Sequence, residues 1–521
     1  MPSRSLATLP DLFENNAKKA VWQARAFVQI VTIAQVPLRS LDLAVIIAYL
    51  AGVTWFGARF KSSQRSLKDY FLGGRNAPWW AIGLSIVSAE TSTLTIIGTP
   101  PLAYAGSYVF LQVVFGYLLA RIVISVIFLP QYFNRQMFTA YELMQRRFGP
   151  RVRKVTAAIF LVTRSLAEGV RVFAISIVVS IILHTTGLAS ILVIVALTLF
   201  YTFEGGMTAV IWTDVIQMGM YVLGAAVSFF VLLGKIPGGF RHVIDVAGPA
   251  GKFQVFNFHW SWTYPYTFWA GLIGGCFLTT ASHGTDQLVV QRLLSAKSER
   301  ESRLALLASW GVIFVQFSLF LTIGVLLWVY QNGRAFGKDE LDRLYPAFIW
   351  ESLPRGIAGL AMAAIIAAAM ANLSAALNSL ASATVVDFYQ PLTHSRYKPE
   401  HYLMVSRVST IFWGGVLAAI AVVASHWGSV LESGLSIASV TLGILLGVFL
   451  LGVLTKRPGE NAAVAGVIAG TIVMLFVKFD TTIPFTWWVL IGSAVTFGVG
   501  YLGGVFQRPT PVPPGIGRES E

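Results

Sequence analysis

The sequence predicts an all-α integral membrane protein with about 13 transmembrane helices. Of its 521 residues, 55% are hydrophobic and only 12% are charged, and the mean hydropathy is +0.68. Water-soluble domains carry about 25% charged residues, which excludes that class here. Apolar stretches of roughly 20 residues, the length that crosses a bilayer as a helix, recur between residues 41 and 506. The body of the protein is therefore predicted to be a helical bundle in a membrane.

Short polar breaks separate the predicted spans. The spans are residues 41–59, 79–99, 108–133, 155–184, 186–203, 207–234, 262–284, 303–331, 356–386, 402–424, 429–454, 461–478 and 485–506. Within residues 1–40, the apolar run 26–38 is too short to span and has basic neighbours, so we interpret it as an interfacial helix. The only cysteine, Cys276, excludes a disulfide within the chain.

The net charge of +14 comes from basic residues in particular loops rather than from a nucleic-acid-binding surface. Lysine and arginine gather at residues 59–75, 135–154 and 292–303, whereas the loops 107–108, 184–187 and 426–429 contain neither. The positive-inside rule places the basic loops in the cytoplasm. The amino terminus is then outside, and the tail 507–521 is cytoplasmic in a cell (inner) membrane.

The predicted span around residues 368–389, AAMANLSAALNSLASATVVDFY, is poor in large aliphatic residues and rich in small polar ones. Small residues let helices pack closely in a membrane, while polar groups at that depth usually face the bundle interior or a pathway. Both interpretations stay open from the residues alone. At helical spacing they form two neighbouring stripes: Ala371, Ala375, Asn378 and Ser382, and Asn372, Ala376, Ser379 and Ala383.

Two other spans have compositions that indicate interrupted helices. Residues 79–101 carry Glu90 among seven serines and threonines, although hydroxyls bonded to the preceding turn would also explain them. Residues 268–287 contain the pair Gly274–Gly275. If 79–234 and 262–454 are two five-helix units, five being odd, the second unit is inverted and both flawed helices come first in their units. That arrangement is typical of the central site of a transporter.

Several motifs follow one another in the order found in a known family. They are DYFLGGRNAPWW (69–80), SAE (88–90), TAYELMQRRFG (139–149), GGMTAVIWTDVIQ (205–217), TDQLVVQRLLSAKS (285–298) and residues 353–389. On these motifs the sequence resembles the sodium/solute symporter family. The resemblance implies two inverted five-helix repeats in a LeuT-like core, with the extra span 41–59 before them and two spans, 461–506, after them. It also implies a secondary active transporter that imports a small organic solute by alternating access.

The resemblance implies a sodium site between the first and eighth core helices. Its carbonyl ligands would be those of Leu84, Val87 and Ala368, and its two side-chain ligands fall on Ala371 and Asn372, where relatives have serines. Ala371 offers no side-chain oxygen, whereas the Asn372 amide oxygen suits a hard cation. Sodium is the expected coupling ion, with a water or Ser374 completing the site, and coupling to protons or uncoupled transport is the alternative.

Other charged residues on predicted spans are interpreted in the same way. By resemblance, Asp214 lies on the inner ion route, and the alternative is a pair with a basic residue at the cytoplasmic membrane edge. The helical spacing of Arg164, Glu168 and Arg171 predicts a structural, self-neutralising cluster. Arg121 is predicted to be architectural. His283 is predicted to be a satisfied surface or interface group, although a histidine could also shuttle protons.

The solute contacts are also inferred from the resemblance. Sugar-binding relatives use a glutamine, an asparagine and a gate tyrosine that correspond here to Thr91, Thr279 and Ser282. These differences favour a monocarboxylate, an amino acid or a vitamin-like acid over a hexose, with Thr91, Ser92, Thr279 and Ser282 as contacts. Glu90 is predicted to hold the helix bend.

Two other function classes are weaker. A membrane sensor would need an output domain, and about fifteen residues follow the last predicted span. An intramembrane enzyme would need a catalytic motif, and we find neither HExxH nor GxSxG. The expected partners are therefore the solute, the ion and the bilayer, with no nucleic acid and no obligate protein partner.

Overall fold

The computed structural model describes residues 39–58, 75–134, 140–201, 207–393, 397, 399–427 and 429–506. In this part of the chain there is no strand, only an isolated bridge between Ala77 and Ala296. The predicted interfacial helix at 26–38 and the tail at 507–521 lie outside the described residues.

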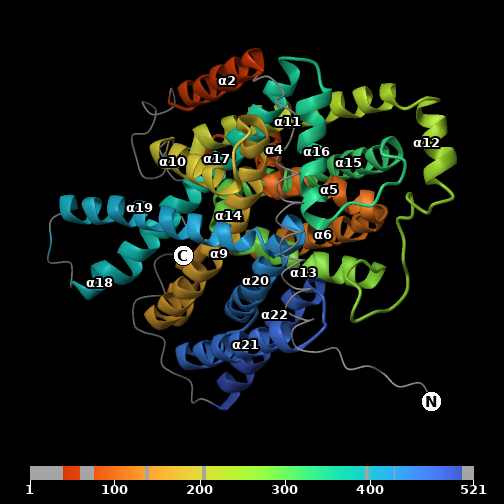
Figure 1. The fold of residues 1–521 in the computed structure, drawn as a ribbon. Coiled ribbons are helices and arrows are strands. Elements are labelled where there is room, and N and C mark those ends of the chain that lie inside the picture. Colours follow the sequence, from red (N-terminus) through yellow and green to blue (C-terminus); the bar gives the residue numbers. More distant parts are fainter. Residues whose placement is uncertain are drawn as a thin grey trace, which may run out of the picture.

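Helices make up almost the whole structure (Figure 1). Those up to residue 247 are α2 Ser40–Ala58, α4 Trp79–Glu90, α5 Thr93–Ala105, η3 Tyr108–Phe110, α6 Leu111–Val123, η4 Ile124–Phe128, α7 Leu129–Asn134, α8 Ala140–Phe148, α9 Pro150–Leu183, α10 Gly187–Tyr201, α11 Met207–Lys235 and α12 Gly239–Ala247. Those after it are η5 Ala270–Gly274, α13 Gly275–Gly284, α14 Gln287–Leu294, α15 Glu299–Tyr330, α16 Lys338–Ser352, α17 Ile357–Ala383, η6 Thr384–Tyr389, α18 Gln390–Leu392, α19 Pro399–Ala424, α20 Val430–Leu454, α21 Glu460–Asp480 and α22 Phe485–Phe506.

The predicted spans overlap these helices, but the predicted number of thirteen spans is not confirmed. Among the described residues, nine helices are long and apolar enough to cross a membrane, and α4 with α5 makes a tenth if the bent pair is one span. Two predicted spans correspond to the shorter apolar windows Ser40–Val53 and Gly187–Leu199. The span predicted at 262–284 becomes helical only at Phe268, where Thr267 caps the helix: its hydroxyl oxygen accepts a hydrogen bond from the Ala270 N–H (3.3 Å).

Contacts between the core helices occur in matched pairs. Helices α4 and α5 pack on α15, as α13 packs on α6, and α4 packs on α11, as α13 packs on α20. Likewise α9 packs on α19 and α20, as α17 packs on α10 and α11. In these pairs of contacts, each helix of the first unit corresponds to one helix of the second unit. The first unit is α4–α5, α6, α9, α10 and α11, and the corresponding helices of the second are, in the same order, α13, α15, α17, α19 and α20. Two structurally equivalent five-helix units produce this pattern.

The remaining helices flank this core on opposite sides. In Figure 1, α2 lies at one edge of the bundle, and α21 and α22 lie at the other. Helix α2 packs on α17 and α11, while α21 and α22 pack on each other and on α20. The buried Asp42 of α2 accepts hydrogen bonds from the backbone N–H groups of Gly356 (2.6 Å) and Gly359 (2.8 Å). It therefore satisfies the free amides at the start of α17.

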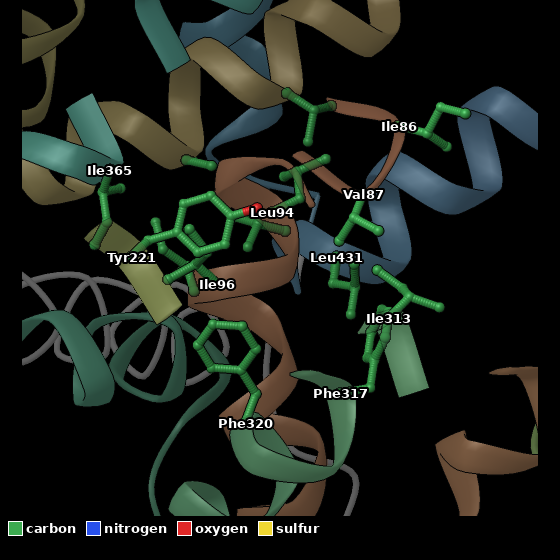
Figure 2. Close-up of a cluster of buried hydrophobic side chains, with 14 of the residues drawn as sticks. Ile86, Val87, Leu94, Ile96, Tyr221, Ile313, Phe317, Phe320, Ile365 and Leu431 are labelled. Atoms are coloured by element: carbon green, nitrogen blue, oxygen red, sulfur yellow. The ribbon is translucent and has the colours of Figure 1, made fainter. Parts of the chain in front are cut away.

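The predicted interruption in span 79–99 is confirmed. Helix α4 ends at Glu90, α5 begins at Thr93, and the two are bent by 66°. Large apolar side chains from several helices surround this bend (Figure 2), so that the turn lies inside the bundle. They include Ile86, Val87, Leu94, Ile96, Tyr221, Phe317, Phe320, Ile365 and Leu431.

The interruption predicted at Gly274–Gly275 is wrong. The π-helical turn η5 runs directly into α13, so the helix is continuous through both glycines. A Cβ atom on Gly274 would lie 2.2 Å from the Thr486 carbonyl oxygen, and one on Gly275 would lie 2.4 Å from the Val113 carbonyl oxygen. These glycines therefore permit close approach of α22 and α6 rather than a break.

Candidate functional site

A cavity of about 270 Å³ lies at the bend between α4 and α5. Its walls come from the two ends of the bend and from α9, α11, α13, α14, α15, α17 and α20. Apolar side chains, among them Phe110, Phe317 and Leu431, make up one part of the wall. Hydroxyl and charged side chains make up the rest.

Three of the four predicted solute contacts line this cavity. They are Ser92 at the start of α5, and Thr279 and Ser282 on α13. Thr91 does not line it: its side chain is fully buried and its hydroxyl donates to Gln316 Oε1 of α15 at 3.1 Å. At the bend, neighbouring residues thus have different surroundings, and Thr91 ties α4 to α15 instead.

The residues predicted to hold sodium divide into two groups. Ala371 and Asn372 line the cavity together with Ala375, whereas Leu84, Val87 and Ala368 are not among its described lining residues. Ala376, one turn after Asn372 on the same predicted stripe, is completely buried. The small polar helix therefore serves both functions that were left open, since one face lines a cavity and another packs against neighbouring helices.

Asp214 of α11 lies in a hydrogen-bonded ion pair. Its Oδ2 atom accepts from Arg292 Nη2 at 2.9 Å, from Arg292 Nε at 3.2 Å and from the Ser85 hydroxyl at 2.5 Å. All three residues are buried, and both charged ones line the cavity. The alternative predicted for Asp214, a pair with a basic residue, is thus present. Sequence reasoning did not identify Arg292, which is 78 positions away along the chain.

Glu90 forms a second buried cluster at the end of α4. Its Oε2 atom accepts from Arg121 Nη2 at 2.5 Å, and Arg121 also donates to Ser309 Oγ (3.0 Å) and to the Tyr117 carbonyl (3.2 Å). His283 Nε2 lies 3.3 Å from the same Glu90 oxygen. His283 is 4% exposed and lines the cavity, so of the two positions predicted for it, surface or interface, the surface position is wrong. Arg121 has the architectural role predicted for it.

The cluster on α9 has the predicted internal pairing. Glu168 accepts from Arg171, and it lies 3.0 Å from Arg164 Nη2. Arg164 also approaches Asp286, at 3.5 Å. Both arginines line the cavity as well. The helical spacing predicted that these residues pair with one another, but it could not predict that the arginines line a cavity.

Hydrogen bonds fasten the loop 248–267 to helices α6 and α20. The Gln112 side chain of α6 donates to the Tyr266 carbonyl (3.1 Å) and accepts from the Asn257 N–H (2.8 Å). The Tyr266 hydroxyl donates to Glu432 of α20 at 2.8 Å. The cavity also reaches Val210 near the start of α11 and residues of α14.

Comparison with known proteins points to one family. The model of the sodium:solute symporter family matches residues 70–470. The chain is 30% identical over 463 residues to a sodium/sialic acid symporter of Proteus mirabilis, covering 87% of this chain and 92% of that protein. It is 29% identical over 443 residues to the human sodium/iodide cotransporter, covering 82% and 67%.

A solved structure supports the same assignment. A Na⁺-coupled sialic acid symporter, in a substrate-bound outward-open state, aligns with a TM-score of 0.77 and 29% identity over 90% of this chain and 98% of that chain. The agreement extends over the core helices and the flanking ones. The cavity at the bend is therefore a site within a fold that a known symporter shares.

Proposed function

We propose, from the premise that this chain belongs to the sodium:solute symporter family and is a sodium-coupled secondary active transporter, that it imports a small organic acid by alternating access. A monocarboxylate, an amino acid or a vitamin-like acid suits the site better than a hexose. The solute would occupy the cavity at the α4–α5 bend and contact Ser92, Thr279 and Ser282.

The observation that carries this proposal is an unsatisfied donor on the cavity wall, the buried Nε atom of Arg171, which has no hydrogen-bond partner in the structure. Glu168 is shared by Arg164 and Arg171, and Arg171 has no other carboxylate within ion-pair distance among the described residues. A carboxylate of the solute would complete the pairing of Arg171, and such charge-assisted hydrogen bonds are the stronger ones. The adjacent serine and threonine hydroxyls can donate to the same group. A neutral sugar could accept from Arg171 only through uncharged hydroxyl groups, which make the weaker kind of hydrogen bond.

The named solutes of the relatives agree with an acidic solute. The Proteus mirabilis relative is a symporter of sialic acid, and the human relative is a cotransporter of iodide. Both are anions at neutral pH. The small cavity volume of about 270 Å³ favours a compact solute for this chain.

For the ion, we propose that the sodium site assembles only when α4 closes on α17. The expected ligands belong to both helices, and of these only Ala371 and Asn372 line the cavity in the present state. Asp214 would take part in the ion route after Arg292 has moved, since a carboxylate paired with a guanidinium offers little attraction to a second cation.

The direction of the cavity suggests which state this is. It reaches α14 and the start of α11, and α14 packs on α8 of the basic segment 140–154 and leads into the basic loop 292–303. If those loops are cytoplasmic, the structure represents an inward-facing state, with the amino terminus outside and the tail 507–521 inside an inner (plasma) membrane. The solved relative is in the outward-open state, so the two structures would represent opposite steps of one cycle.

A ligand screen tests the solute class. We expect small carboxylates to raise the thermal unfolding midpoint of the purified protein when sodium is present, and neutral hexoses to leave it unchanged. Arg171→Gln should weaken the carboxylate response about tenfold or more. Arg303→Gln, which removes an exposed arginine paired with Glu299, serves as the matched control. Stabilisation by a hexose and by no carboxylate would refute the proposal.

Spin labels test the closure and its dependence on sodium. With Cys276→Ser as background, labels at Trp79 of α4 and Ser382 of α17 use two exposed positions near the proposed cytoplasmic end. Sodium should shift their distance distribution toward shorter values, and Asn372→Ala should reduce the shift. Uptake into proteoliposomes should also stop without a sodium gradient. Unchanged uptake without the gradient would contradict sodium coupling.

A further inference from the structure

The two ends of helix α5 differ in how their backbone groups are satisfied. At its carboxyl end, the Lys252 ammonium group donates to the carbonyls of Tyr104 (2.6 Å) and Gly106 (3.0 Å). At its amino end, inside the bundle, the cap residue Ser92 makes no side-chain hydrogen bond to the helix. The first two amides, of Thr93 and Leu94, have no acceptor among the described residues. The positive end of this helix is therefore left unsatisfied.

A second, much smaller cavity lies at this amino end. Its volume is about 10 Å³, close to the space that one water molecule requires. Ser92 and Thr93 of α5, Arg171 of α9 and Asn372 of α17 provide its polar lining. Thr93 is 2% exposed, and its hydroxyl has no hydrogen-bond partner in the structure. The Nε atom of Arg171 is also buried without a partner.

These groups have one chemistry in common, because each can donate a hydrogen bond. The helix amides and the guanidinium can only donate, and the Thr93 hydroxyl and the Asn372 amide can do so. A cation would face the positive end of α5 and the charge of Arg171. An anion would satisfy all of the unpaired donors together. We propose that this cavity is a binding site for a monoatomic anion such as chloride.

The size of the cavity separates this site from the solute site. A volume of about 10 Å³ admits a single-atom ion but not the two oxygens and carbon of a carboxylate with its substituent. The larger cavity shares Ser92, Arg171 and Asn372, so the anion would lie beside the solute. Asn372 is also an expected sodium ligand. Chloride at this site would favour sodium binding nearby, and the two ions would strengthen each other's affinity reciprocally.

A halide titration of the purified full-length protein tests the site. Sodium and ionic strength are held constant while gluconate is replaced by chloride or bromide, and the thermal unfolding midpoint is measured. The wild type should show a saturable stabilisation. Thr93→Val keeps the side-chain shape but removes the hydroxyl, and it should weaken the apparent halide affinity about tenfold, as expected for a lost hydrogen bond to a charged group.

Thr99→Val is the matched control. Thr99 lies on the same helix, is fully buried, also has an unpartnered hydroxyl, and lines neither cavity. Its halide response should equal that of the wild type. An equal response in chloride and gluconate, an equal loss in both variants, or the same saturable response to acetate would overturn the proposal. If Thr93→Val does not fold, the anomalous signal of bromide decides: a peak beside Thr93 in crystals of the wild type supports the site, and its absence refutes it.

Discussion

Helices α4–α5 and α13 hold equivalent positions in the two five-helix units, yet only the first is interrupted. The chain bends by 66° between Glu90 and Thr93, whereas it continues as a helix through Gly274 and Gly275. Both stretches are rich in small and polar residues. The difference shows that such a composition has two causes in a membrane bundle: hydrogen-bonding groups that line a cavity, or glycines that let backbones approach.

An ion pair stabilises the interrupted helix, whereas close backbone packing stabilises the continuous one. Glu90 ends α4 in an ion pair with the fully buried Arg121, which also bonds to Ser309 of α15. The continuous helix formed by η5 and α13 approaches its neighbours closely at Gly274 and Gly275, where backbone atoms of α22 and α6 fill the space that a side chain would take. The two helices should therefore respond to different substitutions.

The largest effect is expected from removing the charge that holds the bend. Arg121→Met leaves Glu90 buried without its main partner, and breaking a buried pair in this way costs about 3–5 kcal/mol. Thermal unfolding of the purified protein measures the loss. Arg303→Met removes an exposed arginine of the Glu299 pair and should change stability by less than about 1 kcal/mol.

A double variant shows whether the charge itself is responsible. Adding Glu90→Gln to Arg121→Met removes the uncompensated carboxylate and should restore part of the lost stability. If Arg121→Met is as stable as Arg303→Met, the ion pair does not hold the bend.

The second effect belongs to the continuous helix. Gly275→Ala would put a Cβ atom 2.4 Å from the Val113 carbonyl oxygen, so α6 and α13 must separate. Overpacking of this kind costs about 1–3 kcal/mol. Gly219→Ala on α11 meets nothing within 4 Å and should stabilise the helix by up to about 1 kcal/mol through higher helix propensity. A lower unfolding midpoint for Gly275→Ala and a higher one for Gly219→Ala would confirm the comparison. An unchanged midpoint for Gly275→Ala would contradict it.

The contrast also marks what could be predicted from sequence. The spans were predictable because each needs a long apolar run, and the bend was predictable because Glu90 and its neighbouring hydroxyls cannot face lipid. The role of Gly274 and Gly275 was not, since a glycine that bends a helix and one that packs against Thr486 look alike in one sequence. Arg292 was missed because its pairing with Asp214 depends on the packing of α14 beside α11.

At the bend itself, neighbouring residues have separate functions that sequence could not distinguish. Thr91 and Ser92 are both hydroxyl residues, but Thr91 bonds to the buried Gln316, and Ser92 lines the cavity. The direction of each side chain depends on the two residues that connect α4 to α5. We therefore expect their substitutions to separate stability from binding.

Thr91→Val should lower stability by about 1 kcal/mol, because it leaves the Gln316 carbonyl oxygen without its donor. Its affinity for the solute should stay within about twofold of wild type. Ser92→Ala should show the reverse: little change in unfolding midpoint and several-fold weaker binding in a thermal-shift titration. A loss of solute affinity in Thr91→Val that matches Ser92→Ala would place both residues in the solute site and remove the distinction.

The smallest effect concerns the carboxyl end of α5, where the Lys252 ammonium group donates to the Tyr104 carbonyl. The same ammonium group lies 4.7 Å from the centre of the Trp328 ring. Lys252→Gln keeps a donor but loses the charge, and interactions of a charge with a helix end are worth about 0.3–1 kcal/mol.

Burial lowers the pKa of the Lys252 ammonium group from its usual 10.5. The folded state thus binds this proton less tightly than the unfolded chain does, and stability rises with pH between the lowered pKa and 10.5. The wild type should gain stability relative to Lys252→Gln as the pH rises from about 8 toward that upper limit. The exposed Lys338→Gln serves as the control, and a wild-type pH dependence identical to that of Lys252→Gln would mean that burial does not lower the pKa of the Lys252 ammonium group.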